Sequence, residues 1–342
     1  MSDAVAPVGR GGGAETAGRR PLVSIVTPVL NEEGSLPIFY ERLRKSIDPL
    51  RGEYEFELIF TNNRSTDRTL ERILAIRAQD PSVQVLTYSR NFGQVASVLG
   101  GMKQASGDVV VLIDVDCEDP PEMIPDFLAG WRAGHDIVYG ERAARPEPAP
   151  ITWGRLFFYR FTRLMADNDI ILDMAEFCLM TSAVRDAVVS TRSVQPFVRG
   201  EIAYYGFSRK AIRYARQRRA QGHTHYDLPR MVEFALQGVL STTTLPLRLP
   251  VFTLPVLMLV NAALVVWWAA GRWPEAFPIL VTVDLLWLVV AVAFIGLYLG
   301  RDYRNRVARP MVVVDWKHSA INTPVECSPN ALPKSGPRPG PV

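Results

Sequence analysis

The chain has 342 residues, of which 48% are hydrophobic, and a formal net charge of only +3 at pH 7. This length suits one large domain or two smaller ones, and the hydrophobic fraction lies at the top of the globular range. Cys117, Cys178 and Cys327 have neither metal-site nor disulfide spacing, which excludes a cysteine-based metal centre or disulfide framework and agrees with a reducing compartment.

Residues 1–20 are rich in Gly and Ala and lack the apolar core of a signal peptide, so we expect a disordered leader. From residue 21 onward, strand and helix patterns alternate. The expected strands cover residues 22–30, 54–60, 83–88, 109–113 and 137–139, and the expected helices cover residues 36–47, 66–77, 95–105 and 124–133. Such alternation predicts an α/β fold, in which helices cover a parallel sheet and ligands bind at the carboxyl ends of the strands.

Polar segments follow the first four expected strands. They are Pro28–Glu33, Thr61–Asp67, Ser89–Gly93 and Asp114–Asp116. Because the carboxyl ends of parallel strands meet at one edge of a sheet, we expect these amides, carboxylates and arginines to line one crevice. The chain contains neither GxxxxGK[ST] nor GxGxxG, so a P-loop or a dinucleotide fingerprint does not explain them.

The fourth of these segments continues into an unusually acidic stretch, LIDVDCEDPPE, from Leu112 to Glu122. Carboxylates at positions i and i+2 of a strand end point the same way, and crowding them without a counter-charge costs stability. A hard divalent cation such as Mg²⁺ or Mn²⁺ would remove this cost, and such a cation is typically shared with substrate phosphates. The alternative interpretation is a solvated acidic turn in which Asp119 caps the next helix.

Between residues 199 and 219, seven cationic side chains accompany a single acid, Glu201. Guanidinium groups suit phosphate ligands, and such a face would also bind anionic lipid headgroups. Charge alone would allow a nucleic acid, with Tyr214 stacking on a base, but the apolar segments described next argue against that partner. The seven cations are Arg199, Arg209, Lys210, Arg213, Arg216, Arg218 and Arg219.

Two apolar segments near the C-terminal end have the length of membrane-spanning helices. Residues 251–270 carry no charge, and residues 277–299 carry only Asp284. The linker between them is too short for a domain, so we expect a helical hairpin. Asp284 should face a helix partner, for which an oligomer interface is one candidate place. By the positive-inside rule, Arg248 and the arginines after residue 300 place both flanks in the cytoplasm.

Two further segments have the pattern of amphipathic helices in a membrane interface, residues 153–165 and about 228–240, although a core helix would look similar. The predicted organisation is therefore a cytosolic domain at 21–227, an interfacial helix at 228–245, a membrane hairpin at 246–300, a cytosolic juxtamembrane segment at 301–325 and a Pro-rich disordered tail at 326–342.

Four motifs in this order, TPVLNEE, NNRSTDRTL, SRNFGQ and DVDCEDPPE, resemble family 2 glycosyltransferases of the GT-A fold. Longer stretches, among them DIVYGERAAR, FVRGEIAYYGF, RRAQGHTHY and the hairpin followed by GLYLGRDYRNRVARPMVVV, resemble the polyprenyl-phosphate glycosyltransferases. This group contains dolichyl-phosphate mannose synthase and the bacterial undecaprenyl-phosphate glucosyltransferases. The resemblance extends from Val23 to Val314.

The resemblance implies roles for individual residues. Asp114, Asp116 and Glu118 would hold Mg²⁺ or Mn²⁺, with Asp114 also binding the nucleotide sugar and Asp116 acting in catalysis. Glu176 and Arg199 would also be catalytic, Glu176 as the acceptor-side carboxylate. The remaining nucleotide-side positions are Pro28, Glu32, Asn62, Asn63, Arg90 and Asn91, and the positions proposed to contact lipid phosphate are Arg199, Arg213 and Arg219.

The implied reaction transfers one sugar, with inversion, from a UDP-sugar or GDP-sugar to undecaprenyl phosphate at the cytoplasmic face of the bacterial inner membrane. A UDP-sugar is favoured. A phosphate monoester has a second pKa of about 6, so the acceptor is mostly dianionic and needs cations more than a strong general base. A homo-oligomer is compatible with this interpretation, and no nucleic acid is expected.

Two segments depart from the family pattern. Asn63 and Arg64 replace the aspartate and glycine of the usual Asp-Gly-Ser loop, and Glu176 replaces an aspartate after Ala175, where the family tends to have glycine. Glu176 could instead cap the next helix. The alternatives are a mannose synthase that uses GDP-mannose and an inactive membrane adaptor. A processive polysaccharide synthase is excluded, because the chain lacks the Gln-x-x-Arg-Trp motif and the additional spans.

Overall fold

The computed structural model describes residues 19–142, 174–191, 198–217, 243–271, 273, 275–307 and 309–322. Several predictions fall outside these residues. They are the leader up to residue 18, the amphipathic helices at 153–165 and 228–240, Arg218 and Arg219, and the tail at 326–342.

A seven-stranded sheet in the order β3-β2-β1-β4-β6-β5-β7 forms the centre of the domain. Its strands are β1 (Leu22–Val29), β2 (Glu55–Asn62), β3 (Val83–Thr87), β4 (Val109–Leu112), β5 (Ile137–Arg142), β6 (Met174–Thr181) and β7 (Arg209–Tyr214). Strands β1 to β4 pair in parallel, as predicted, whereas β6 runs antiparallel to both of its neighbours, β4 and β5. The sheet is therefore mixed but mostly parallel.

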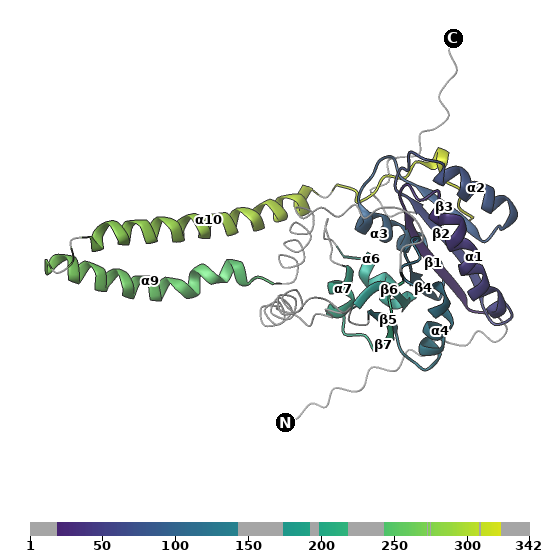
Figure 1. Cartoon of the computed structure of the whole chain (residues 1–342), viewed down its shortest axis with the longest axis horizontal. Helices are drawn as coiled ribbons and strands as arrows, with labels where there is room; N and C mark the ends of the chain where they lie inside the picture. Colours follow the sequence, from purple (N-terminus) through teal and green to yellow (C-terminus); the bar gives the residue numbers. More distant parts are fainter. Residues whose placement is uncertain are drawn as a thin grey trace, which may run out of the picture.

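Helices cover both faces of this sheet (Figure 1). They are α1 (Ser35–Ile47), α2 (Thr69–Gln79), α3 (Gln94–Gln104), α4 (Ile124–Arg132), α6 (Ser182–Val189) and α7 (Val198–Tyr204). Alternate residues of β1 point to opposite faces. Ile25 packs in one buried cluster with Phe39 of α1, and Val26 packs in another with Leu99 of α3. This arrangement is a three-layer α/β/α domain.

The nine elements predicted up to residue 139 are all present, with boundaries that differ by a few residues. The two largest differences are of three residues: β5 ends at Arg142 rather than at residue 139, and α2 begins at Thr69 rather than at residue 66. Asp67 explains the later start, because its Oδ1 accepts hydrogen bonds from Thr69 N at 3.0 Å and Thr69 Oγ1 at 2.6 Å. A side-chain acceptor of this kind satisfies the free amides at a helix N-terminus.

Two long helices, α9 (Leu245–Ala269) and α10 (Ala276–Val307), lie side by side and project from the domain (Figure 1). Both are long and apolar enough to cross a membrane, and most of their large apolar side chains are exposed. Asp284 of α10 accepts a hydrogen bond from Asn261 Nδ2 of α9 at 2.8 Å. The helix partner expected for Asp284 is therefore found within the hairpin itself.

After α10 the chain returns to the sheet as a segment that we call the C-terminal strap, residues 309–322. It contains the short 3₁₀ helix η3 (Trp316–His318) and pairs with the edge strand β3 through antiparallel bridges at Val85–Ala320 and Tyr88–Val314. Figure 1 shows the strap in yellow beside β3 and α2. It covers backbone groups that an edge strand would otherwise leave exposed.

Candidate active site

The loops that follow β1 and β2 are joined to each other by hydrogen bonds. Asn31 Oδ1 accepts from Thr66 N at 2.8 Å, and Glu32 N donates to Thr69 Oγ1 at 2.9 Å. Asn31 has a φ of 56°, in the left-handed region that Asn tolerates better than most residues. The backbone around Glu32, a predicted nucleotide-side residue, is thus fixed by the second loop.

The loops that follow β2 and β3 are joined through Asn63. Its Nδ2 donates to Asn91 Oδ1 at 2.8 Å, and its Oδ1 accepts from Phe92 N at 2.9 Å. Asn62 Oδ1 accepts from Ser65 N at 3.0 Å. Both asparagines are buried. The hydrogen bonds show that four predicted nucleotide-side residues, Asn62, Asn63, Arg90 and Asn91, come from two adjoining loops.

Arg90 lies at the exposed side of this cluster. Its guanidinium stacks on the ring of Phe92, with 4.2 Å between Cζ and the ring centroid. A cation over an aromatic ring is held by the ring quadrupole without losing its hydrogen-bond donors. The contact therefore keeps an arginine fork at the rim of the loop cluster.

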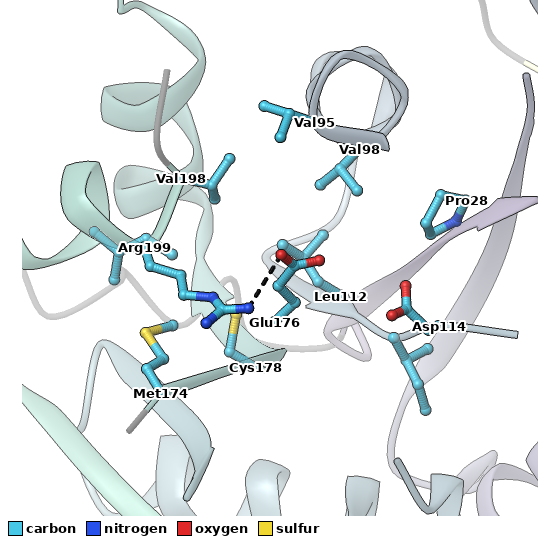
Figure 2. A pocket seen from close by; sticks show the side chains of 12 residues that line it. Pro28, Val95, Val98, Leu112, Asp114, Met174, Glu176, Cys178, Val198 and Arg199 are labelled. Carbon is cyan, nitrogen blue, oxygen red and sulfur yellow. Dashed lines mark hydrogen bonds and ion pairs between the residues drawn. The ribbon is translucent and has the colours of Figure 1, made fainter. Parts of the chain in front are cut away.

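A pocket at the end of β4 contains an ion pair between a glutamate and an arginine, and a second carboxylate (Figure 2). Arg199 of α7 donates from one terminal nitrogen to Glu176 Oε1 at 3.2 Å. Gln94, the first residue of α3, donates from Nε2 to Glu176 Oε2 at 2.9 Å and to Asp114 Oδ1 at 3.5 Å. The amide of Gln94 thus bridges the two carboxylates. The other lining residues are Pro28, Val95, Val98, Leu112, Ile113, Met174, Cys178, Val198 and Ile202.

The reversed strand β6 brings Glu176 to this place. Leu112 of β4 pairs with Cys178 of β6 in an antiparallel register. Asp114 follows Leu112 by two residues, and Glu176 precedes Cys178 by two residues. The two carboxylates therefore lie opposite each other beyond the last pair, although they are 62 positions apart in the sequence.

The carboxylates around the pocket repel one another, and one arginine donor in it has no partner among the described residues. Burial raises the pKa of the Asp114 carboxyl well above its ordinary value, and the charges of Glu176, Asp116 and Asp119 raise that pKa further. In addition, the Nε of Arg199 is buried without a hydrogen-bond partner among the described residues. A site with crowded carboxylates and an unsatisfied guanidinium donor is arranged for charged ligands of both signs.

Comparison with known proteins identifies the fold family. A family model described as Glycosyl transferase family 2 matches residues 24–186. An uncharacterized glycosyltransferase of Bacillus subtilis (strain 168), YkcC, is 31% identical over 317 residues, which cover 87% of this chain and 95% of that protein. The chain belongs to glycosyltransferase family 2.

Other relatives of this family 2 protein carry more specific names. A prophage bactoprenol glucosyl transferase homolog of Escherichia coli (strain K12) is 31% identical over 309 residues, covering 85% of this chain and 98% of the relative. The SfII prophage-derived bactoprenol glucosyl transferase of Shigella flexneri is 30% identical over 313 residues, covering 86% and 98%. Both alignments are much longer than the stretch of residues 24–186 that the family model matches.

In this family 2 domain, the acidic loop after β4 is held from the side of β7. Cys117 adopts a left-handed φ of 60° and turns the chain between Asp116 and Glu118. The Glu118 carboxylate forms an ion pair with Arg216, and the Glu118 carbonyl accepts a hydrogen bond from Gln217 N at 2.9 Å. The residues directly after β7 thus contact the loop through both side chain and backbone.

Asp119 is the second anchor of the acidic loop. Its carboxylate is 2% exposed, accepts a hydrogen bond from the Tyr214 hydroxyl and forms an ion pair with Arg142 at 3.3 Å. Burial raises the pKa of Tyr214, and the adjacent Asp119 charge raises it further, so the hydroxyl keeps its proton. Asp119 is therefore anchored to β5 and β7, and the alternative in which it caps the next helix is wrong: the 3₁₀ helix η2 (Pro121–Met123) has Pro120 at its N-cap and no side-chain cap hydrogen bond.

The residues of the loop fit a divalent cation held by two protein ligands. Carboxylate oxygens of Asp114 and Asp116 are the donors that Mg²⁺ and Mn²⁺ prefer, and the repulsion felt by Asp114 means that a positive charge would stabilise the loop. Among the described residues, no three His, Cys, Asp or Glu side chains converge on one point. Glu118 pairs with Arg216 here, so its role as a third ligand stays a prediction.

The predicted lipid-phosphate residues do not all meet at the pocket. Arg199 lines it, whereas Arg213 is an exposed residue of β7 that pairs with Glu141 at 3.2 Å, and Arg219 lies outside the described residues. From the sequence alone, Gln94 and Arg142 have no predicted role, and Tyr214 is only a candidate stacking residue. For Gln94 a signal existed, because it directly follows the third-strand loop and begins a helix.

Proposed function

We propose that this protein transfers a single hexose from a nucleoside diphosphate sugar to a polyprenyl phosphate at the cytoplasmic face of the bacterial inner membrane. The observation that carries the proposal is the pocket in which Glu176 and Arg199 face Asp114 across an otherwise largely apolar lining. The long alignments with bactoprenol glucosyl transferases support the lipid acceptor. UDP-sugars are the favoured donors, and GDP-mannose is the alternative.

The donor would bind along the ends of β1 to β4. Asn63 and Asn91, joined by a hydrogen bond, and the neighbouring Asn62 would form the nucleoside side of the site, and Arg90 offers a guanidinium at its rim. Asp114 and Asp116 would hold Mg²⁺ or Mn²⁺ together with the diphosphate. A bound divalent cation would supply charge neutralisation for the leaving diphosphate.

The acceptor would enter from the side of α7. Arg199 would bind the lipid phosphate through its unsatisfied Nε and a terminal nitrogen, while Glu176 and Gln94 fix the orientation of the guanidinium. Val198, Ile202 and Met174 provide an apolar wall for the first part of the prenyl chain. Because the phosphate is already mostly dianionic near pH 7, Glu176 acts by orienting Arg199 rather than as an obligatory base.

In the reaction, an oxygen of the lipid phosphate attacks the anomeric carbon from the side opposite the nucleoside diphosphate. The new bond joins that oxygen to the anomeric carbon, and the bond from this carbon to the diphosphate breaks. The nucleoside diphosphate leaves with the bonding electron pair, and the configuration of the sugar is inverted. No covalent enzyme intermediate is required.

The hairpin would anchor this reaction at the membrane. Arg248 lies in the first turn of α9, and Arg301, Arg304 and Arg306 lie in the last turns of α10, so both cationic ends belong on the cytoplasmic side. The charge of Arg301 opposes the rise in pKa that burial gives Glu201 of α7, so the helix that carries Arg199 lies within electrostatic range of the base of the hairpin. This proximity supports an acceptor that enters the pocket from the membrane side.

The test uses the purified full-length protein in detergent with undecaprenyl phosphate, Mg²⁺ or Mn²⁺, and a panel of UDP- and GDP-sugars. Mass spectrometry should detect one glycolipid, whose formation EDTA abolishes and added metal restores. The same panel with Glu176→Gln serves to connect the product to this pocket. Folded protein that makes no glycolipid from any donor would favour an inactive adaptor and contradict the proposal.

A further inference from the structure

The C-terminal strap behaves as an additional edge strand next to β3. Val85 and Ala320 exchange two backbone hydrogen bonds of 2.9 and 2.8 Å, and Asp315 N donates to Thr87 O at 2.8 Å. Ser89 N donates to Val313 O at 2.9 Å. The strap thereby follows β3 to the loop that carries Arg90 and Asn91, at the carboxyl end of the sheet.

The strap also holds the loop after β2 through an ion pair. Arg64 donates from a terminal nitrogen to Asp315 Oδ2 at 3.0 Å, and the same carboxylate oxygen contacts His318 Nδ1 at 2.8 Å. Arg64 has a φ of 65°, a left-handed conformation that is unfavourable for a residue with a Cβ atom. The contact with Asp315 therefore stabilises a loop conformation that Arg64 alone would disfavour.

A second set of hydrogen bonds connects the strap to Asn62. Thr87 Oγ1 donates to His318 O at 2.7 Å and accepts from Asn62 Nδ2 at 3.4 Å. Ser319 Oγ accepts from Thr87 N at 2.9 Å and donates to Asp315 O at 2.8 Å. The strap thus acts on the loop from both sides, on Arg64 directly and on Asn62 through Thr87.

We infer that Asp315 and Ser319 are positioning residues for donor binding. They hold the loop of residues 62–65 in the conformation that forms the nucleotide side of the site, in which the buried Asn62 and Asn63 fix the backbone. The inference rests on the proposed function, because it takes this loop to be the nucleotide side of the site. It assigns a part in donor binding to a segment that follows the membrane hairpin and lies outside residues 24–186, the part matched by the family model.

The inference predicts a specific change in kinetics. Asp315→Asn keeps the size of the side chain but weakens the ion pair, so the KM for the nucleotide sugar should rise about two- to five-fold, as is usual for a partly exposed pair. The kcat and the KM for polyprenyl phosphate should not change. Ser319→Ala should act in the same direction.

A second substitution separates positioning from general stability. Glycine adopts left-handed φ values without strain, so Arg64→Gly makes the loop conformation independent of Asp315. The double variant Arg64→Gly/Asp315→Asn should therefore bind nucleotide as the unmodified protein does. Glu53→Gln is the control, because it breaks another surface ion pair, with Arg132, in the loop that precedes β2.

The experiment is isothermal titration of the full-length protein in detergent with UDP and with GDP, each with Mg²⁺, alongside thermal unfolding. Weaker binding by Asp315→Asn, restored binding by the double variant and normal binding by Glu53→Gln would support the inference. Equal binding by Asp315→Asn and by the unmodified protein would overturn the inference and leave the proposed function intact. A loss of nucleotide binding that Arg64→Gly fails to restore would have the same two consequences. Unmodified protein that binds neither nucleotide would overturn both.

Discussion

Asp116 is one of the carboxylates whose charge raises the pKa of Asp114. Loss of the Asp116 charge should therefore relieve repulsion in the folded protein but lower its activity. Asp116→Asn removes a charge from a crowded loop but keeps the Oδ1 that accepts from Glu118 N at 3.0 Å. We expect kcat to fall by about 10²- to 10³-fold, the usual effect of losing a group that stabilises transition-state charge, while the melting temperature does not fall. Asp126→Asn, at an exposed position of α4, is the control. Near-normal activity of Asp116→Asn would contradict the role of this loop.

The same residues show how far the sequence alone reaches. Asp114 and Asp116 follow a buried strand at i and i+2, so their approach to one site could be predicted from spacing. The contacts of Gln94 and Tyr214 could not be predicted in this way, because each depends on where a distant element packs: β6 brings Glu176 to Gln94, and β7 brings Tyr214 to Asp119. The structure also shows Glu118 paired with Arg216, and spacing holds no information about such a partner.

At the scale of the elements, β7 stabilises the acidic loop through one buried hydrogen bond. Tyr214→Phe removes the hydroxyl that donates to Asp119 and leaves a buried carboxylate with one donor fewer. The free energy of unfolding should fall by about 1–3 kcal/mol, the usual cost of an unsatisfied buried polar group, and thermal unfolding in detergent should show a lower melting temperature. Arg213→Gln is the control on the same strand, because Arg213 is 80% exposed in its pair with Glu141. Equal melting temperatures for the two variants would contradict this role of β7.

The first five strands and four helices followed from periodicity, because each has its own hydrophobic pattern. The reversed direction of β6 did not, since the polarity of a strand depends on the connection that leads to it rather than on the strand's own residues. The pairing of the strap with β3 could not be predicted from periodicity either. Val313 and Ala320 lie about 230 positions from their partners, and no local pattern in the strap indicates an edge strand.

At the scale of the whole molecule, the proposed orientation makes opposite ends of the hairpin accessible from opposite sides of the membrane. Helix α9 has 25 residues and is about 37 Å long, enough to cross a hydrocarbon core of about 30 Å. Glu275, in the turn between the helices, should therefore face the periplasm, and Lys317, in the strap, should face the cytoplasm. Both residues are exposed, so cysteines placed there can report the orientation.

The labelling experiment depends on a low background from the protein's own thiols. Burial raises the pKa of Cys178 to about 12 and also raises the pKa of Cys117, so the reactive thiolate is scarce at both positions, and Cys327 can be replaced by serine. An impermeant maleimide added to intact spheroplasts should label Glu275→Cys but not Lys317→Cys, and permeabilised cells should show labelling of both. Labelling of Lys317→Cys in intact spheroplasts would place the strap, and with it β3 and the donor loops, outside the cytoplasm, where cytosolic nucleotide sugars do not reach them.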